Sequence, residues 1–197
     1  MTAWPELLGA PDEVAPRLLG ATLRHGAVVV RITEVEAYGG ADDPGSHAYR
    51  GRTPRTGVMF GPAGRLYCYL SYGMHVCANV ALGEEGVAGA VLVRAGEVVD
   101  GLDVARARRP GSSDQDLARG PARLTRALAI SLDHDGADLA SGAVTLELGA
   151  PVDDVAAGPR TGLRLAADRP WRFWMPGERS VSPYRKHPRA TAHHPDL

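Results

Sequence analysis

The sequence of 197 residues lacks the features of a secreted or membrane-spanning protein. Its only cysteines, Cys68 and Cys77, do not have metal-ligand spacing, so we expect reduced thiols in the core. No apolar run approaches the roughly 20 residues that a membrane helix needs. No basic segment followed by an apolar stretch marks a secretory signal at the N-terminus. These absences predict a cytoplasmic protein that does not associate with membranes.

A surplus of positive charge is also missing. The net charge is −1 at pH 7, and Lys186 is the only lysine. Proteins that bind nucleic acids usually carry a basic surplus that neutralises phosphates. The arginines are nevertheless grouped, and the first group consists of Arg50, Arg52 and Arg55. A genome rich in G and C would enrich arginine equally well, so this grouping alone does not establish DNA binding.

The length suits a single domain, residues 1–197, because two ordinary domains would each be too small to bury a core. The alternation of apolar residues predicts a strand over residues 27–38. The next segment, residues 39–64, holds seven glycines and three prolines. Long ordered loops of this kind are more often functional than not.

Further along the chain, strands are more numerous than helices. We predict strands over residues 89–95, 143–148, 161–165 and 171–175, and helices over residues 11–19, 102–109 and 121–130. No regular βαβ alternation is present. The pattern favours the α+β class, with a curved, mostly antiparallel, barrel-like sheet, flanking helices and a protruding β-hairpin. The polar tail, residues 183–197, is expected to be disordered without a partner. A monomer is expected because no heptad pattern is evident.

Two carboxylates lie on one face of the first long strand. Residues two apart in a strand share a side, so Glu34 and Glu36 project together with Tyr38. The simplest reading is a pair of solvated edge residues. Because their face is apolar upstream and aromatic downstream, partial desolvation of a catalytic base is the alternative.

Other chemistry is compatible with the same strand. Two carboxylates about 7 Å apart along a strand also suit a glycoside hydrolase. A metal site is a third alternative, although its spacing matches no closed zinc or EF-hand pattern. Its candidate ligands are Glu34, Glu36, Asp42, Asp43 and His47.

Residues 66–82 predict a β-hairpin. Setting the apolar residues of its two halves on the core side fixes a loop of Tyr72, Gly73 and Met74. This register places Tyr67 and Tyr69 on the other face, with Asn79. An exposed tyrosine at the apex suits insertion between stacked bases, although a second core layer below a surface tyrosine is the simpler interpretation.

These motifs together resemble the alkyladenine (3-methyladenine) DNA glycosylase family. The matching segments keep their order over residues 16–181: they are residues 34–38, 46–55, 58–60, 67–74, 77–80, 91–95, 120–124 and 171–174. The resemblance implies a mixed, largely antiparallel sheet with an inserted hairpin. It also implies an enzyme without metal or organic cofactor, located in the cytoplasm at the nucleoid, that acts on double-stranded DNA containing damaged purines. Thr56 departs from the family, which often has asparagine there.

The resemblance also implies residue roles. Glu36 would be the general base for the attacking water, which Arg94 and the main-chain carbonyl near Met175 would help to hold. The pocket for the flipped purine would be lined by Tyr38, His47, Tyr69 and Asn79. Tyr72 would fill the gap left in the duplex.

The predicted function is therefore base excision repair. The enzyme would flip out alkylated or deaminated purines, such as 3-methyladenine, 7-methylguanine, hypoxanthine or ethenoadenine, and hydrolyse the N-glycosidic bond with water as nucleophile. We expect Arg50, Arg52 and Arg55 to contact the DNA backbone. A non-catalytic nucleic-acid-binding module is the alternative, although it leaves Glu36, behind its aromatic neighbours, without a purpose.

Overall fold

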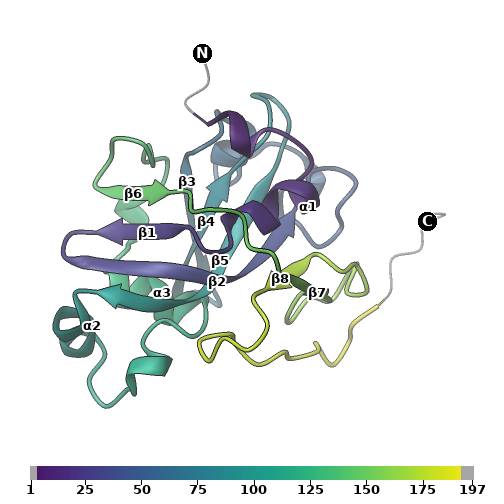
Figure 1. Cartoon of the computed structure of the whole chain (residues 1–197). Coiled ribbons are helices and arrows are strands. Elements are labelled where there is room, and N and C mark those ends of the chain that lie inside the picture. Colours follow the sequence, from purple (N-terminus) through teal and green to yellow (C-terminus); the bar gives the residue numbers. More distant parts are fainter. Residues whose placement is uncertain (1–3, 192–197) are drawn as a thin grey trace.

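The computed structural model describes residues 4–191, whose centre is one antiparallel sheet (Figure 1). Its main strand order is β3-β4-β5-β2-β1-β6, and β8 pairs with both β2 and β7. The strands are β1 (Thr22–His25), β2 (Val28–Tyr38), β3 (Leu66–Ser71), β4 (His75–Ala81), β5 (Ala90–Asp100), β6 (Val144–Glu147), β7 (Ala156–Gly158) and β8 (Arg172–Trp174). The predicted α+β class with a largely antiparallel sheet is confirmed, and β3 and β6 lie at the ends of this order.

Short helices cover the sheet. Helices α2 (Leu102–Arg108) and α3 (Pro121–Leu128) pack against each other and against β2 and β5 (Figure 1). The predicted helix over residues 11–19 is α-helical only as α1 (Pro11–Val14) and continues as a 3₁₀ turn, Ala15–Leu18. Pro16 lies at this change, where its missing N–H cannot continue the α-helical hydrogen bonds. The other 3₁₀ turns are Pro5–Leu7, His47–Arg50, Gly57–Phe60, Asp114–Asp116 and Leu132–His134.

Strand β2 pairs with β1, β5 and β8, and its pairing with β5 is irregular beside the two glutamates. The register shifts between Ile32 and Glu34 and again between Glu34 and Val35. Such bulges redirect side chains and are common beside functional sites. The opposing Gly96 permits this close approach, because a Cβ there would lie 2.4 Å from the Arg31 carbonyl oxygen.

The hairpin has the predicted register. Tyr67 pairs with Asn79 and Tyr69 with Cys77, and Ser71 and His75 close the loop. Both cysteines are buried free thiols, as expected. Tyr67 belongs to a small second core with Ala48, Met59, Ala88 and Ala90. Ala48 and Met59 belong to the segment between β2 and β3, so this second core holds that segment in a fixed position.

Two predictions about the C-terminal part need correction or restriction. Residues 161–165 are not a strand: Gly162 has a φ of +73°, which ends the extended conformation. The part of the tail that is described contacts this segment through hydrogen bonds from Gly162 N–H to the Arg185 carbonyl and from Thr191 N–H to the Arg164 carbonyl. Residues 192–197 lie outside the described residues, so the disordered tail and the single domain stay predictions. Within residues 4–191, no helix has the length and apolar character to cross a membrane.

Candidate active site

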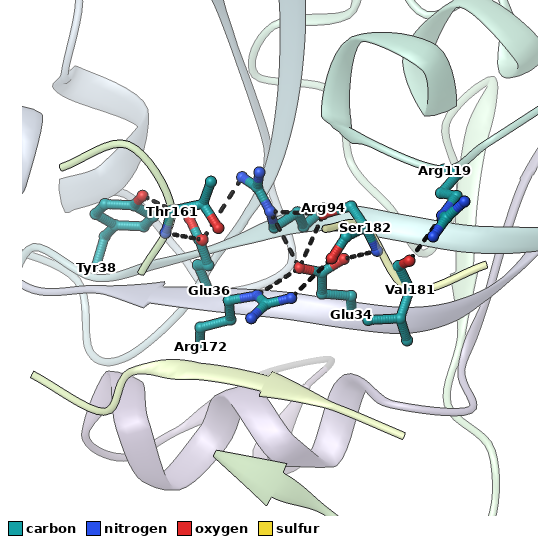
Figure 2. Close-up of polar contacts among 9 residues, drawn as sticks. All are labelled: Glu34, Glu36, Tyr38, Arg94, Arg119, Thr161, Arg172, Val181 and Ser182. Carbon is teal, nitrogen blue, oxygen red and sulfur yellow. Dashed lines mark hydrogen bonds and ion pairs between the residues drawn. The ribbon is translucent and has the colours of Figure 1, made fainter. Parts of the chain in front are cut away.

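Glu36 is fully buried, and donors from two segments contact its two carboxylate oxygens (Figure 2). The Tyr38 hydroxyl donates to Oε2 at 2.8 Å, and the main-chain N–H of Thr161 donates to Oε1 at 2.7 Å. Burial and the adjacent Glu36 charge raise the pKa of Tyr38 well above its usual range. Tyr38 is therefore a proton donor to Glu36 at neutral pH. Together these donors fix the orientation of the carboxylate.

Arg94 connects Glu36 with Glu34. Its Nη1 lies 3.5 Å from Oε1 of Glu36, and its Nε lies 3.1 Å from Oε1 of Glu34. Burial lowers the pKa of Arg94, but the charges of Glu36 and Glu34 more than compensate and raise it overall. Figure 2 shows the guanidinium between the two carboxylates, so one cation is the ion-pair partner of both.

Glu34 is held more completely than Glu36. Its Oε1 accepts from Arg172 Nε at 2.6 Å and from the Ser182 hydroxyl at 3.0 Å, and its Oε2 accepts from Ser182 N–H at 2.6 Å (Figure 2). The side chain is 0% exposed. A carboxylate whose lone pairs are so fully used has a structural role in joining β2, β8 and the C-terminal segment. The two glutamates thus have different environments.

An aromatic cavity adjoins the Tyr38 side of this network. The space between its lining residues is about 380 Å³, which includes solvent at its open side. Tyr38, His47, Tyr69 and Asn79 all line it, so the structure brings the four predicted pocket residues together. The remaining lining residues are Gly45, Ser46, Met59, Tyr67, Ala90 and Leu163. Glu36 is not a lining residue and lies behind Tyr38, to which it is hydrogen-bonded.

His47 lies at the exposed side of the cavity. Its Nε2 lies 3.3 Å from Nη2 of Arg55, its Nδ1 lies 3.2 Å from the Tyr67 hydroxyl, and its ring packs edge-on against Tyr69. Because an arginine can only donate, the proton of the neutral ring belongs on Nδ1, which then donates to Tyr67. Partial desolvation and the charge of Arg55 lower the pKa of His47 to about 4. His47 is therefore a neutral residue of the pocket.

Asn79 and Tyr69 are positioned by the hairpin. The Asn79 amide donates to the Tyr67 carbonyl at 3.0 Å, which leaves its carbonyl oxygen available to the cavity. Burial raises the pKa of the Tyr69 hydroxyl, and the Arg55 guanidinium lies 5.5 Å from the centroid of its ring. A planar, electron-poor group would thus find aromatic faces and a hydrogen-bond acceptor together.

Tyr72 is at the apex of the hairpin, away from the cavity lining. Its side chain is 87% exposed, its φ is +52°, and Met74 beside it is 71% exposed. Leu70, one of the apolar residues that the hairpin prediction sets on the core side, is 41% exposed, because β4 pairs with β5 only over residues 79–81 and the hairpin end extends beyond that pairing. Arg50, Arg52 and Arg55 are all exposed. A second cavity beside Arg94 is also basic: Arg119, Arg123 and Arg185 line it with Asp116, Gly120, Ser182 and Pro183.

The main-chain carbonyl near Met175 is expected to help hold the attacking water, and this role stays a prediction. In the β2–β8 register Glu36 pairs with Arg172, and the Met175 N–H donates to the Thr33 carbonyl. Thr161 lies beside Glu36. No sequence pattern marks Thr161, because its main-chain N–H in a turn makes the contact.

The acidic residues considered for a metal site do not gather. Asp43 is paired with Arg160, and Glu34 with Arg172 and Ser182. Within the described part of the chain, no group of three or more histidine, cysteine or acidic side chains has an arrangement that would hold a metal ion.

Comparison with known proteins identifies the family. The model of the methylpurine-DNA glycosylase family matches residues 6–179. A protein of Nocardia farcinica is 58% identical over 94% of this chain and 92% of its own, and one of Leifsonia xyli is 56% identical over 92% and 91%. A protein of Frankia casuarinae is 55% identical over 86% of both chains. All three bear the name "Putative 3-methyladenine DNA glycosylase". The chain therefore belongs to the methylpurine-DNA glycosylase family, and the protein is a DNA glycosylase of DNA repair.

Proposed function

We propose that this DNA glycosylase flips alkylated or deaminated purines, with 3-methyladenine as the principal substrate, out of duplex DNA and hydrolyses their N-glycosidic bonds. The observation that carries the proposal is the buried Glu36 carboxylate, oriented by Tyr38, Thr161 and Arg94 directly behind an aromatic cavity. The family membership supports the same reaction class.

Glu36 acts as the general base in this proposal. It accepts a proton from a water molecule whose oxygen attacks C1′ as the sugar develops oxocarbenium character. The bond between C1′ and the purine nitrogen breaks, and its electron pair leaves with the base. A 3-methyladenine base already carries positive charge, so it departs as a neutral molecule, whereas a deaminated purine, which is neutral in DNA, must take up a proton from solvent as it leaves. Arg94 helps to hold the water beside Glu36.

The cavity receives the everted base. Tyr38, His47 and Tyr69 supply aromatic surface, and stacking on one aromatic ring contributes about 1 to 3 kcal/mol per base. Flipping costs a few kcal/mol and less for a damaged base, so these contacts can offset it. The Asn79 carbonyl oxygen faces the purine edge, where it sets the choice of base. The neutral His47 avoids repulsion of a cationic purine.

Duplex DNA is the proposed partner, bound by a monomer at the nucleoid. Tyr72 inserts into the gap left by the flipped nucleotide. Two groups of arginines neutralise phosphates locally despite the net charge of −1: Arg50, Arg52 and Arg55, and the arginines that line the cavity beside Arg94.

One assay tests the reaction class. Purified protein is incubated with methylated duplex DNA in the presence of EDTA, and free purine is measured. We expect release of 3-methyladenine by the wild-type protein and no release by Glu36→Gln, which should still bind the DNA. Retained turnover by Glu36→Gln, or release that EDTA abolishes, would reject the mechanism. Binding without release by the wild-type protein would instead identify a non-catalytic module.

A further inference from the structure

Behind the aromatic cavity lies an ion pair that the proposed chemistry does not use. Arg160 Nη1 lies 2.6 Å from Oδ2 of Asp43, and Nη2 lies 2.7 Å from Oδ1, so the pair is a bidentate fork. Both side chains are 0% exposed. Taking two charges out of water has a large desolvation cost, which makes such a pair weak evidence for stability and raises the question of what it positions.

Asp43 organises the segment that leads into the cavity. Besides the guanidinium, its two oxygens accept from Gly39 N–H at 3.0 Å and from Gly45 N–H at 3.1 Å. Gly45 and the next two residues, Ser46 and His47, line the cavity. One carboxylate thus fixes both ends of the turn between β2 and His47.

Arg160 contacts β2, the strand that carries Glu36, directly. Its Nη1 donates to the Ala37 carbonyl at 2.9 Å, and its guanidinium carbon lies 4.8 Å from the centroid of the Tyr38 ring. Trp171 lies near the same guanidinium, at 5.2 Å from its ring centroid. Arg160 therefore fixes the ring whose hydroxyl donates to Glu36.

The residue after Arg160 is Thr161, whose N–H donates to the other oxygen of Glu36. The packing around Arg160 has no spare room: a Cβ on Gly45 would lie 2.7 Å from Nη2 of Arg160 and 2.8 Å from Cδ1 of Leu163. The position of the Arg160 guanidinium hence affects both hydrogen-bond donors to Glu36, the Tyr38 hydroxyl and the Thr161 N–H. It also affects two parts of the cavity lining, the Tyr38 ring and the turn before His47.

We infer that the Asp43–Arg160 pair is a positioning device for base release, which holds Tyr38, the turn before His47, and Thr161 in one arrangement around Glu36 and the cavity. The inference rests on the proposed function. Neither residue touches the reacting atoms. Their contribution is to the orientation of the groups that do, and misplacement by about 1 Å can lower a rate about 100-fold.

The variants must avoid an unpaired buried charge. Removing either partner alone would leave the other charge buried and uncompensated. The principal variant is therefore the double substitution Asp43→Asn with Arg160→Gln, which removes both charges. Arg160→Lys keeps the charge and loses the planar fork. The matched control is Asp114→Asn with Arg106→Gln, because Arg106 and Asp114 form a similar fork, at 2.9 and 2.8 Å, on the surface.

The readout is the single-turnover rate of 3-methyladenine release from methylated duplex DNA, per folded molecule as measured by urea unfolding. We expect the control to equal the wild type, and both Asp43/Arg160 variants to be slower by about 10- to 100-fold although folded. Combining Arg160→Lys with Tyr38→Phe should then cost less than the product of the two separate effects, because both act on the Glu36 donor.

Two results would overturn the inference: folded variants with the wild-type rate, or a loss that follows only the folded fraction. If the variant combining Arg160→Lys with Tyr38→Phe lost as much rate as the product of the two single losses, Arg160 would not act through Tyr38. These failures differ from failure of the proposed function, in which the wild-type protein itself releases no base or Glu36→Gln remains active.

Discussion

The main-chain N–H of Thr161 donates a 2.7 Å hydrogen bond to Oε1 of Glu36, across 125 residues of sequence. The other oxygen accepts from Tyr38, only two residues away on the same strand. A local and a distant donor therefore hold the two ends of one buried carboxylate. A main-chain donor is fixed by the fold, whereas the tyrosine hydroxyl can be removed by substitution.

Tyr38→Phe tests the local donor while keeping the ring that lines the cavity. A hydrogen bond to a charged group contributes roughly 1.5 to 3 kcal/mol, so its loss should slow single-turnover base release roughly 10-fold or more. The exposed Tyr49 supplies the control, and Tyr49→Phe should leave the rate unchanged. An unchanged rate for Tyr38→Phe would mean that Thr161 and Arg94 alone orient Glu36.

Tyr72→Ala tests the apex of the hairpin. Because the side chain is 87% exposed, its removal should leave the urea midpoint close to that of the wild type. Loss of one stacking contact of about 1 to 3 kcal/mol should slow release from duplex DNA roughly 5- to 100-fold. Release from single-stranded DNA should fall less, because no gap has to be filled.

Val104→Ala is the matched control for Tyr72, since Val104 is another exposed apolar residue, located on α2. Val104→Ala should change neither the urea midpoint nor the rate of base release. If Tyr72→Ala slowed base release equally on single-stranded and duplex DNA, Tyr72 would contribute to DNA binding in general and not to filling the gap.

His47 links stability to pH. Its pKa is about 4 in the folded protein and 6.5 in model compounds, so the unfolded chain takes up the proton first as the pH falls. The stabilising contribution is complete above about pH 6.5 and is lost as the pH falls toward 4. His47 is exposed on its outer side, so screening should limit the effect to about 1 kcal/mol or less. Urea unfolding at pH 7.5 and 4.5 should show a smaller acid loss for His47→Gln than for the wild type, and equal losses would contradict the assignment.

The sequence predicts the parts of the site that lie on regular elements. Period-two alternation places Glu36 and Tyr38 on one face of β2 and brings Tyr67 opposite Asn79, as found. Gly73, at a φ of +69°, allows the tight apex that puts Tyr72 in solvent. These features follow from local chemistry and a fixed repeat.

The parts that the sequence does not predict depend on tertiary contacts. Thr161 contributes an N–H that every residue except proline has, so nothing in its identity indicates its role. Arg160 and Asp43 are 117 residues apart, and no local pattern pairs them. The bulges beside Glu34 also shift the register of β2 against β5, which a regular alternation of residues does not predict. The sequence could therefore locate the two glutamates but not distinguish their environments.

That distinction is testable by comparing Glu34→Gln with Glu36→Gln. Glu34 accepts from Arg172 and twice from Ser182, so Glu34→Gln leaves a buried arginine without its carboxylate. Breaking a buried pair in this way typically costs about 3 to 5 kcal/mol, which should appear as a large fall in the urea midpoint. The Glu34→Gln molecules that remain folded at low temperature should still release base, whereas folded Glu36→Gln should not. If folded Glu34→Gln is inactive and folded Glu36→Gln is active, then the general base is Glu34, and the assignment of this role to Glu36 is wrong.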